Sequence, residues 1–155
     1  MLVYLIRHGK AKPDSPTGRD ADRPLRKLGR RQAEHLAAWL EAHPTPPTTL
    51  VSSGLVRAEQ TAQAILETLE CTHEHDERLG DFFADDTPER LARRHAHEPA
   101  LAIVGHNEHL SMSLSNWIGG AERLRTGEMA VLSIDDPDAD VLDVTLLERV
   151  RLDER

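Results

Sequence analysis

Short, continuously apolar segments alternate along this chain with longer segments whose apolar residues recur at helical spacing. The first short segment, at residues 2–6, is Leu-Val-Tyr-Leu-Ile, and a second of the same kind lies at residues 100–104. Strands that are buried on both faces of a parallel sheet have this composition, because neither face meets water. We therefore predict that both segments are strands and that helices cover both faces of their sheet.

The remaining pattern predicts the other elements of such a fold. Apolar residues at helical spacing indicate helices over residues 33–40, 55–69 and 110–118, and Thr-Pro-Glu at 87–89 indicates the start of another. Strands are expected at 49–52, 129–134 and 141–147, with a turn around Asp-Pro-Asp at 136–138. This order predicts an α/β three-layer sandwich, a mainly parallel central sheet with helices on both faces, as a single domain over residues 1–155.

Charge and composition narrow the range of partners and compartments. The chain has 19 Lys and Arg against 27 Asp and Glu, a formal net charge of −8, which argues against a nucleic-acid partner. The apolar run at 2–6 is followed at once by Arg7 and His8, so it is too short for a signal peptide or a membrane span. The single cysteine, Cys71, excludes an intramolecular disulfide. We expect a cytoplasmic protein with no membrane partner.

Positive charge gathers near the amino terminus of this acidic chain. Residues 1–31 hold nine Lys and Arg against three Asp. Within this region, residues 10–24 are rich in Pro, Asp, Gly and Arg and have no apolar period, which predicts a surface loop of functional length. A local basic region is either a solvated helix face or a means of drawing an anionic ligand into a cleft.

Polar residues follow three of the predicted strands. They are Arg-His-Gly at 7–9, Ser-Ser-Gly at 52–54, which leads to Arg57, and Gly-His-Asn at 105–107. Open α/β sheets bind ligands at the carboxyl ends of their strands, so we expect these residues to meet in one crevice. The rigid forks of two arginines can each hold two phosphoryl oxygens. The sequence therefore predicts a phosphate site.

Two histidines in the same crevice suggest covalent catalysis. A neutral imidazole nitrogen is a competent nucleophile toward phosphorus when an acceptor fixes its other nitrogen, and we assign this role to His8. His106, as an imidazolium, would stabilise the charged oxygens of the phosphoryl group during its transfer. A mechanism of this kind requires no metal and no other cofactor.

The run Ser-Gly-Leu-Val-Arg-Ala-Glu-Gln-Thr-Ala at residues 53–62 is the most distinctive motif. Together with the earlier Arg-His-Gly and the later Gly-His, it makes the chain resemble the histidine phosphatase superfamily. Arg-Pro-Leu-x-x-x-Gly at 23–29 and Thr-Gly-Glu-Met-Ala at 126–130 are similar to the SixA-type branch, the phosphohistidine phosphatases. The resemblance covers roughly residues 1–134.

The resemblance implies a role for each matching residue. It makes His8 the histidine that accepts the phosphoryl group, Arg7 and Arg57 the phosphate clamps, and His106 the second histidine of the pocket. It also implies that Arg23 is a phosphate ligand; the alternative is a salt bridge to Asp20 or Asp22.

Two neighbours of His8 complete the expected substrate-binding set. They are Gly9 and Lys10, of which Lys10 either contacts the phosphate or steers it by its charge. The chain also departs from the family pattern at two positions: Gly54 and Glu108 stand where prolines are usual. Neither departure removes a catalytic side chain.

The presence of a general acid would decide the substrate. Hydrolysis of a phosphomonoester expels an alkoxide of high pKa, so it benefits from a carboxylic acid that protonates the leaving oxygen. Asp81 is the best candidate here, whereas Asp85 and Asp86 are expected at the start of the helix at Thr87. Phosphohistidine needs a weaker acid, because its leaving imidazole departs readily once it is protonated.

We therefore expect a phosphatase that hydrolyses phosphohistidine in a protein. The first alternative is a phosphomonoesterase for a small metabolite such as a sugar, nucleotide or cofactor phosphate, and the second is a catalytically silent module that binds phosphorylated proteins. His73 and His75 could form a metal pair on a strand, but no carboxylate or cysteine stands at a recognisable ligand spacing, so we expect no metal site.

Overall fold

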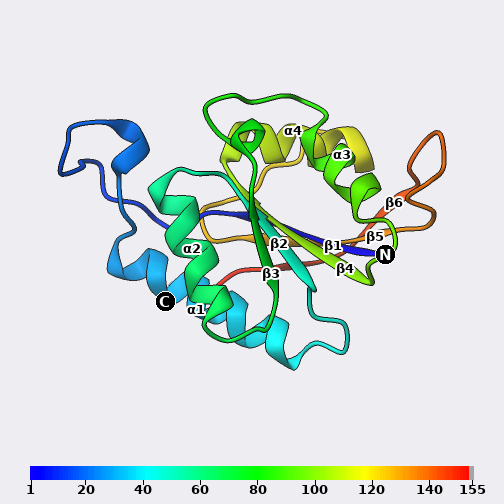
Figure 1. Ribbon diagram of the computed structural model, residues 1–155, viewed down its shortest axis with the longest axis horizontal. Helices are drawn as coiled ribbons and strands as arrows, with labels where there is room; N and C mark the ends of the chain where they lie inside the picture. Colours follow the sequence, from blue (N-terminus) through cyan, green and yellow to red (C-terminus); the bar gives the residue numbers. More distant parts are fainter. Residues whose placement is uncertain (154–155) are drawn as a thin grey trace.

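The computed structural model describes residues 1–153, and the strands among them form one six-stranded sheet in the order β3-β2-β4-β1-β5-β6 (Figure 1). The strands are β1 (Leu2–Arg7), β2 (Thr49–Ser52), β3 (Thr72–His75), β4 (Ala100–Gly105), β5 (Met129–Ile134) and β6 (Val144–Val150). β1 to β4 are parallel to one another, and β5 and β6 pair antiparallel at one edge. The predicted mainly parallel sheet is confirmed.

Helices cover both faces of this sheet, as predicted (Figure 1). α1 (Lys27–Ala42) and α2 (Val56–Leu66) lie on one face, and α3 (Thr87–Arg94) and α4 (Asn107–Ile118) lie on the other. Short 3-10 turns, η1 (Asp20–Asp22) and η2 (Glu77–Leu79), lie in the connections. Within residues 1–153, no helix has both the length and the apolar character needed to cross a membrane.

β1 shows why a continuous apolar strand needs two helical layers. Its side chains alternate between the faces of the sheet. Tyr4 and Ile6 enter the core with α1 and α2, whereas Val3 and Leu5 enter the core with α3 and α4. All four are fully buried, and each buried apolar side chain of this size contributes about 1.5–3 kcal/mol relative to an exposed one.

Two strands differ from the sequence-based expectation. β3 was not among the predicted strands, because its sequence Thr-His-Glu-His contains no apolar residue; it lies at the edge of the sheet and pairs only with β2. Charged and polar residues are common on edge strands, where they discourage pairing with other chains. β6 begins at Val144 rather than at residue 141, because residues 135–143 form the loop that joins it to β5.

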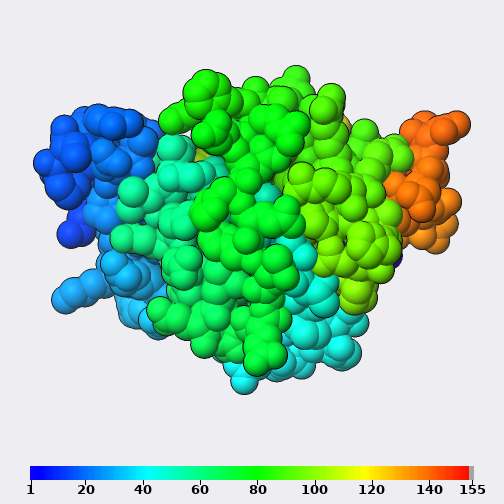
Figure 2. All heavy atoms as spheres, viewed as in Figure 1, coloured from blue at the N-terminus to red at the C-terminus, as the bar shows by residue number. Residues whose placement is uncertain are grey.

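The connections define a crevice at the carboxyl ends of β1 and β4, which are neighbours in the sheet. From β1 the chain passes through α1 toward the β3 edge, and from β4 it passes through α4 on the opposite face toward the β6 edge. Such a switch point leaves a space between the two departing connections, where α/β proteins bind ligands. The segment between β1 and α1 protrudes as a dark-blue lobe at one end of the molecule (Figure 2).

Candidate active site

Most of the expected site residues meet at this crevice. In the β1–β4 register Arg7 stands opposite Gly105, and the backbone N–H of His8 donates to the Gly105 carbonyl oxygen at 3.1 Å. The ring centroids of His8 and His106 are 5.1 Å apart. A cleft of ≈ 460 Å³ opens here, lined by Arg7, His8, Lys10, Ala11, Arg23, Arg57, His106, Asn107, Glu108, His109 and Thr126.

His8 has the protonation state that a nucleophile requires. Its side chain is buried, and burial, followed by the charges of nearby arginines, lowers its pKa to about 4 against the pull of a hydrogen bond to Gly9. A neutral imidazole carries one N–H, and Nδ1 lies 2.7 Å from the Gly9 carbonyl oxygen, which can only accept. Nδ1 therefore donates, and Nε2 holds the free electron pair.

His106 caps the start of α4, and its charge differs from the one expected from the sequence. Burial, then the neighbouring His8 and Arg57, lowers the pKa of His106 to about 3, so in the absence of phosphate it is neutral rather than an imidazolium. Its Nε2 is 2.7 Å from the Ser53 hydroxyl, and its Nδ1 is buried without a hydrogen-bond partner. This leaves Nδ1 available to a ligand.

Arg57 lies in the first turn of α2 and joins the cleft to the β1–α1 connection. Its side chain is buried, and it donates to the Asp20 carbonyl oxygen at 2.9 Å and to the Asp20 carboxylate at 3.0 Å. Arg23 Nε donates to the same carboxylate at 2.8 Å. Arg23 therefore forms the salt bridge to Asp20 that was the alternative to a phosphate contact. It also lines the cleft.

The family-like motifs hold one another in place. The N–H of Gly9 donates to Thr61 Oγ1, and the N–H of Leu25 donates to Gln60 Oε1. Side chains of α2 therefore hold the Arg-His-Gly motif at 7–9 and the Arg-Pro-Leu motif that begins at 23. A side chain on Gly9 would meet the backbone of Gly29 at 2.5 Å, which explains why both positions are glycine. The Gly9 N–H already has a partner and Gly9 packs closely against Gly29, while its expected contact with substrate stays a prediction.

Arg7 and Lys10 also line the cleft, as expected. Arg7 donates through one terminal nitrogen to the Leu124 carbonyl oxygen at 3.1 Å, while its Nε is buried without a partner. Arg57 Nε is also buried without a partner. Buried guanidinium N–H groups normally have acceptors, so these free donors suit an anionic ligand.

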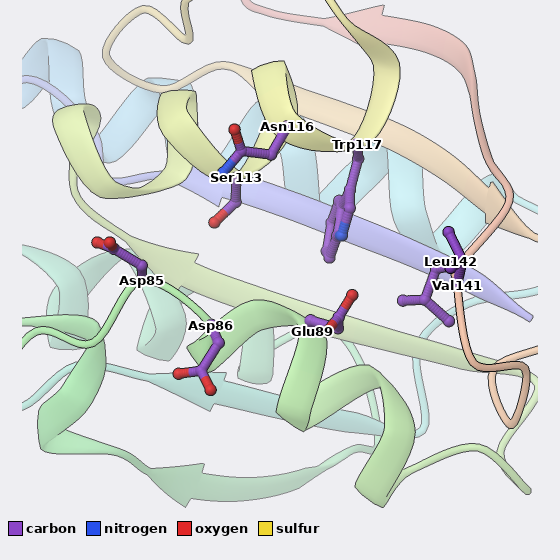
Figure 3. A pocket seen from close by; sticks show the side chains of 8 residues that line it. All are labelled: Asp85, Asp86, Glu89, Ser113, Asn116, Trp117, Val141 and Leu142. Carbon is purple, nitrogen blue, oxygen red and sulfur yellow. The ribbon is translucent and has the colours of Figure 1, made fainter.

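Asp81, the expected general acid, lies away from the cleft, whereas Asp85 and Asp86 lie at the start of α3 as expected. Asp81 is exposed and lies beside a different hollow, with Phe82 and Gly80, so the structure does not bring it to the cleft. Asp85 and Asp86 precede α3 and line a separate cleft of ≈ 300 Å³ between α3 and α4 (Figure 3). The acid that does line the histidine cleft is Glu108, in the first turn of α4.

Three residues have contacts at the site that the sequence did not predict in this form. Glu108 was not predicted as part of the site, Asp20 was considered only as a salt-bridge partner of Arg23, and Ser53 was expected in the crevice as one of the polar residues that follow a strand. Glu108 was noticed only because it stands at a position where proline is usual. Ser53 contacts His106 rather than the space where a phosphate would lie, and the Ser52 hydroxyl bonds His73 instead. Asp20 and Ser53 act through contacts between distant segments, which local spacing does not reveal.

This fold, with paired histidines and arginines at the ends of β1, β2 and β4, is the arrangement of a histidine phosphatase. The sequence profile of the histidine phosphatase superfamily (branch 1) matches residues 3–89, more than half of the chain. The chain belongs to this superfamily.

Solved structures agree with this placement. The chain is 26% identical to a protein assigned as phosphohistidine phosphatase SixA from Agrobacterium tumefaciens, with a TM-score of 0.82 over 96% of this chain and 97% of that one. It is 19% identical to the protein histidine phosphatase SixA complexed with tungstate, with a TM-score of 0.85 over 97% of both chains. A protein assigned as an alpha-ribazole-5′-P phosphatase from Escherichia coli K-12 is 21% identical, with a TM-score of 0.70 over 95% and 94%. No curated protein matches the sequence.

Proposed function

We propose that this protein is a phosphohistidine phosphatase that carries the phosphoryl group on His8 as a covalent intermediate. The observation that carries the proposal is the state of His8, a buried neutral imidazole whose Nδ1 is fixed by Gly9 and whose Nε2 holds a free electron pair in a cleft lined by Arg7 and Arg57. The similar SixA structure is a complex with tungstate, a tetrahedral oxyanion like phosphate, and this supports an oxyanion as the ligand of such a protein.

In the first step, His8 Nε2 forms a bond to phosphorus as the bond from phosphorus to the substrate nitrogen breaks. Arg7 and Arg57 donate to the phosphoryl oxygens, on which charge accumulates during the transfer. His106 contributes its unpartnered Nδ1. When the Ser53 hydroxyl donates its proton to Nε2, the proton of the neutral ring is on Nδ1, which can then donate to a phosphoryl oxygen. The departing nitrogen keeps the electron pair of the broken bond and takes up a proton from solvent water, so the substrate imidazole leaves as a neutral ring.

In the second step, water attacks the phosphorus atom and the bond to His8 breaks. His8 recovers its electron pair, and inorganic phosphate leaves the cleft. The same arginines hold the phosphoryl group in both steps, because its charge and shape are unchanged. The nucleophile and the positive charge come from the chain itself, so we propose that turnover requires no metal ion.

The walls of the cleft favour an N–P substrate. Among residues 1–153, the carboxylate that lines the cleft is Glu108, which is exposed, so the cleft wall holds no buried carboxylic acid to protonate an alkoxide. Of the two phenylalanines, Phe82 is 69% exposed beside another hollow, and Phe83 stacks on His109 at a centroid distance of 3.3 Å. Neither phenylalanine is among the residues that line the cleft, so the cleft wall offers no phenylalanine on which a nucleoside base would stack.

A small-metabolite phosphomonoesterase is the second candidate, and Glu108 is the observation that favours it. A carboxylic acid at the rim of the cleft can protonate the oxygen of an alcohol leaving group. Similar structures include proteins named as phosphatases of small metabolites, such as the mycobacterial glucosyl-3-phosphoglycerate phosphatase.

Initial hydrolysis rates separate the two candidates. The rates are measured in the presence of a chelator on a phosphohistidine peptide and on a panel of phosphomonoesters, for the wild-type chain, His8→Ala and Glu108→Gln. We expect a strong preference for the peptide, no turnover by His8→Ala, and little change in peptide hydrolysis by Glu108→Gln. Preference for an ester, with a large loss in Glu108→Gln, would establish the phosphomonoesterase instead.

A further inference from the structure

The structure contradicts the expectation that His73 and His75 lack a carboxylate partner. Glu59 of α2 lies beside them, and its two carboxylate oxygens are 2.7 Å and 2.8 Å from His75 Nε2. Glu59 precedes His75 by 16 residues and comes from a different element, so the spacing along the sequence concealed the contact. These three residues do not line the catalytic cleft.

We propose that Glu59, His73 and His75 bind a divalent transition-metal ion, with zinc as the best-suited metal. One potential ligand atom from each residue lies within 4.8 Å of the other two. Ligands of a tetrahedral zinc ion stand about 3.4 Å apart, given metal–ligand distances of about 2.1 Å. Small rotations of the side chains therefore suffice to bring the three atoms onto one ion.

The backbone positions the two histidines for this purpose. His73 and His75 are two residues apart on β3, so both project from the same face of the strand, and their ring centroids are 4.4 Å apart. The strand is at the sheet edge and His75 is exposed, so an ion reaches the site directly from solvent.

A further contact prepares His73 as a ligand. Its Nε2 is 2.8 Å from the hydroxyl of Ser52, which is fully buried in β2. When this nitrogen donates its proton to the hydroxyl oxygen, Nδ1 is left with the electron pair that a metal requires. Hydrogen bonds of this kind fix the tautomer and the ring orientation of metal-binding histidines.

The donor set determines the class of metal. Two imidazole nitrogens and one carboxylate oxygen suit zinc and similar ions, whereas calcium and magnesium prefer oxygen ligands alone. The ion takes the place of the proton between His75 and Glu59, and that proton is released to solvent. A site with three protein ligands leaves one position for water. The ion would link α2, two residues beyond Arg57, to the edge strand β3.

Zinc titration of the full chain by calorimetry tests this proposal, with thermal unfolding and the absorption spectrum of bound cobalt as independent readouts. We expect one zinc ion per chain, a rise in melting temperature with zinc, and cobalt bands of a four-coordinate site. His75→Ala and Glu59→Gln, which alter partly or fully exposed side chains, should each lower the affinity by at least about tenfold.

Two control variants make the result specific. His97→Ala removes another exposed histidine and should bind zinc as the wild-type chain does. His8→Ala removes a cleft histidine and should likewise leave the binding unchanged. The proposal is overturned if the wild-type chain binds no zinc at about 100 micromolar, roughly the weakest affinity that a specific site would have. It is also overturned if His75→Ala and Glu59→Gln bind zinc as tightly as wild type, or if His8→Ala abolishes zinc binding.

Discussion

At the scale of single residues, burial decides the chemistry of His8 and His106. An exposed histidine titrates near pH 6.5, whereas burial lowers the pKa of His8 to about 4 and that of His106 to about 3. Both rings are therefore neutral across the physiological range. For His8 this is the reactive form, because the proton that would block Nε2 is absent.

The charge state of His8 can be measured directly. We expect its ring signals in NMR spectra of the phosphate-free protein to remain those of a neutral imidazole from pH 8 down to about pH 5, since its pKa is about 4. His8→Gln identifies the signals by their disappearance. A transition of the His8 signals near pH 6.5 would show that burial does not hold the ring neutral.

Loss of the Arg57 side chain should lower the rate of hydrolysis strongly. Arg57→Ala removes charge-assisted donors that act on the phosphoryl oxygens in the transition state, and loss of one such donor lowers the rate by about 100-fold or more. Steady-state kinetics on the phosphohistidine peptide measures this loss. Arg31→Ala, which removes an exposed arginine of α1, is the matched control and should retain wild-type activity.

At the scale of elements, the β1–α1 connection places the Asp20 carboxylate on two arginines of the cleft. Asp20 contacts both Arg57 and Arg23, and although partial desolvation opposes it, the hydrogen bonds and charges of these arginines hold the pKa of Asp20 below its usual value. A phosphoryl group entering the cleft competes with this carboxylate for the same donors. The connection thus influences affinity as well as access.

Asp20→Asn tests this competition. The amide retains the size of the side chain but removes its charge, and an exposed ion pair is worth up to about 1 kcal/mol. We therefore expect the affinity for inorganic phosphate or tungstate, measured by calorimetry, to rise by up to about fivefold. Asp22→Asn is the control, because Asp22 lies in the same turn but does not contact Arg57. This variant should bind phosphate or tungstate as the wild-type chain does. Weaker binding by Asp20→Asn would instead make Asp20 a residue that positions Arg57.

The elements themselves were predicted unevenly, for a physical reason. β1, β2, β4 and β5 and the helices α1, α2 and α4 have apolar patterns set by the cores they enter, so sequence alone indicated them. α3 was indicated by the Thr-Pro-Glu signal at its start. β3 carries a charged residue and no apolar one, and most of β6 is exposed or half-buried. At these edges of the sheet, pairing with a neighbouring strand, rather than side-chain burial, fixes the conformation.

At the scale of the whole molecule, the lowered histidine pKa values make stability depend on pH. In the unfolded chain His8 and His106 bind protons below about pH 6.5, while in the folded chain they do so only near pH 4 and pH 3. The unfolded state therefore binds more protons in this window. The stabilising effect is complete above pH 6.5 and is lost as the pH falls toward these lower values.

Urea unfolding at pH 7, 6 and 5 measures this effect. Each such histidine lowers the free energy of unfolding by up to about 1.4 kcal/mol per pH unit below pH 6.5. We expect the wild-type chain to lose stability over this range and His8→Gln to lose less, since one of the two groups is gone. Parallel pH profiles for the two proteins would mean that His8 binds protons equally in both states.

The sequence by itself determined the α/β sandwich, the family and the residues that gather at the strand ends, because burial patterns and short motifs are local properties of the chain. Tertiary structure decided what local patterns do not contain. It made His106 neutral, placed Asp20 on Arg57, put Glu108 rather than Asp81 at the cleft, and brought Glu59 to His75. Each of these depends on burial or on contact between segments that are far apart in the chain.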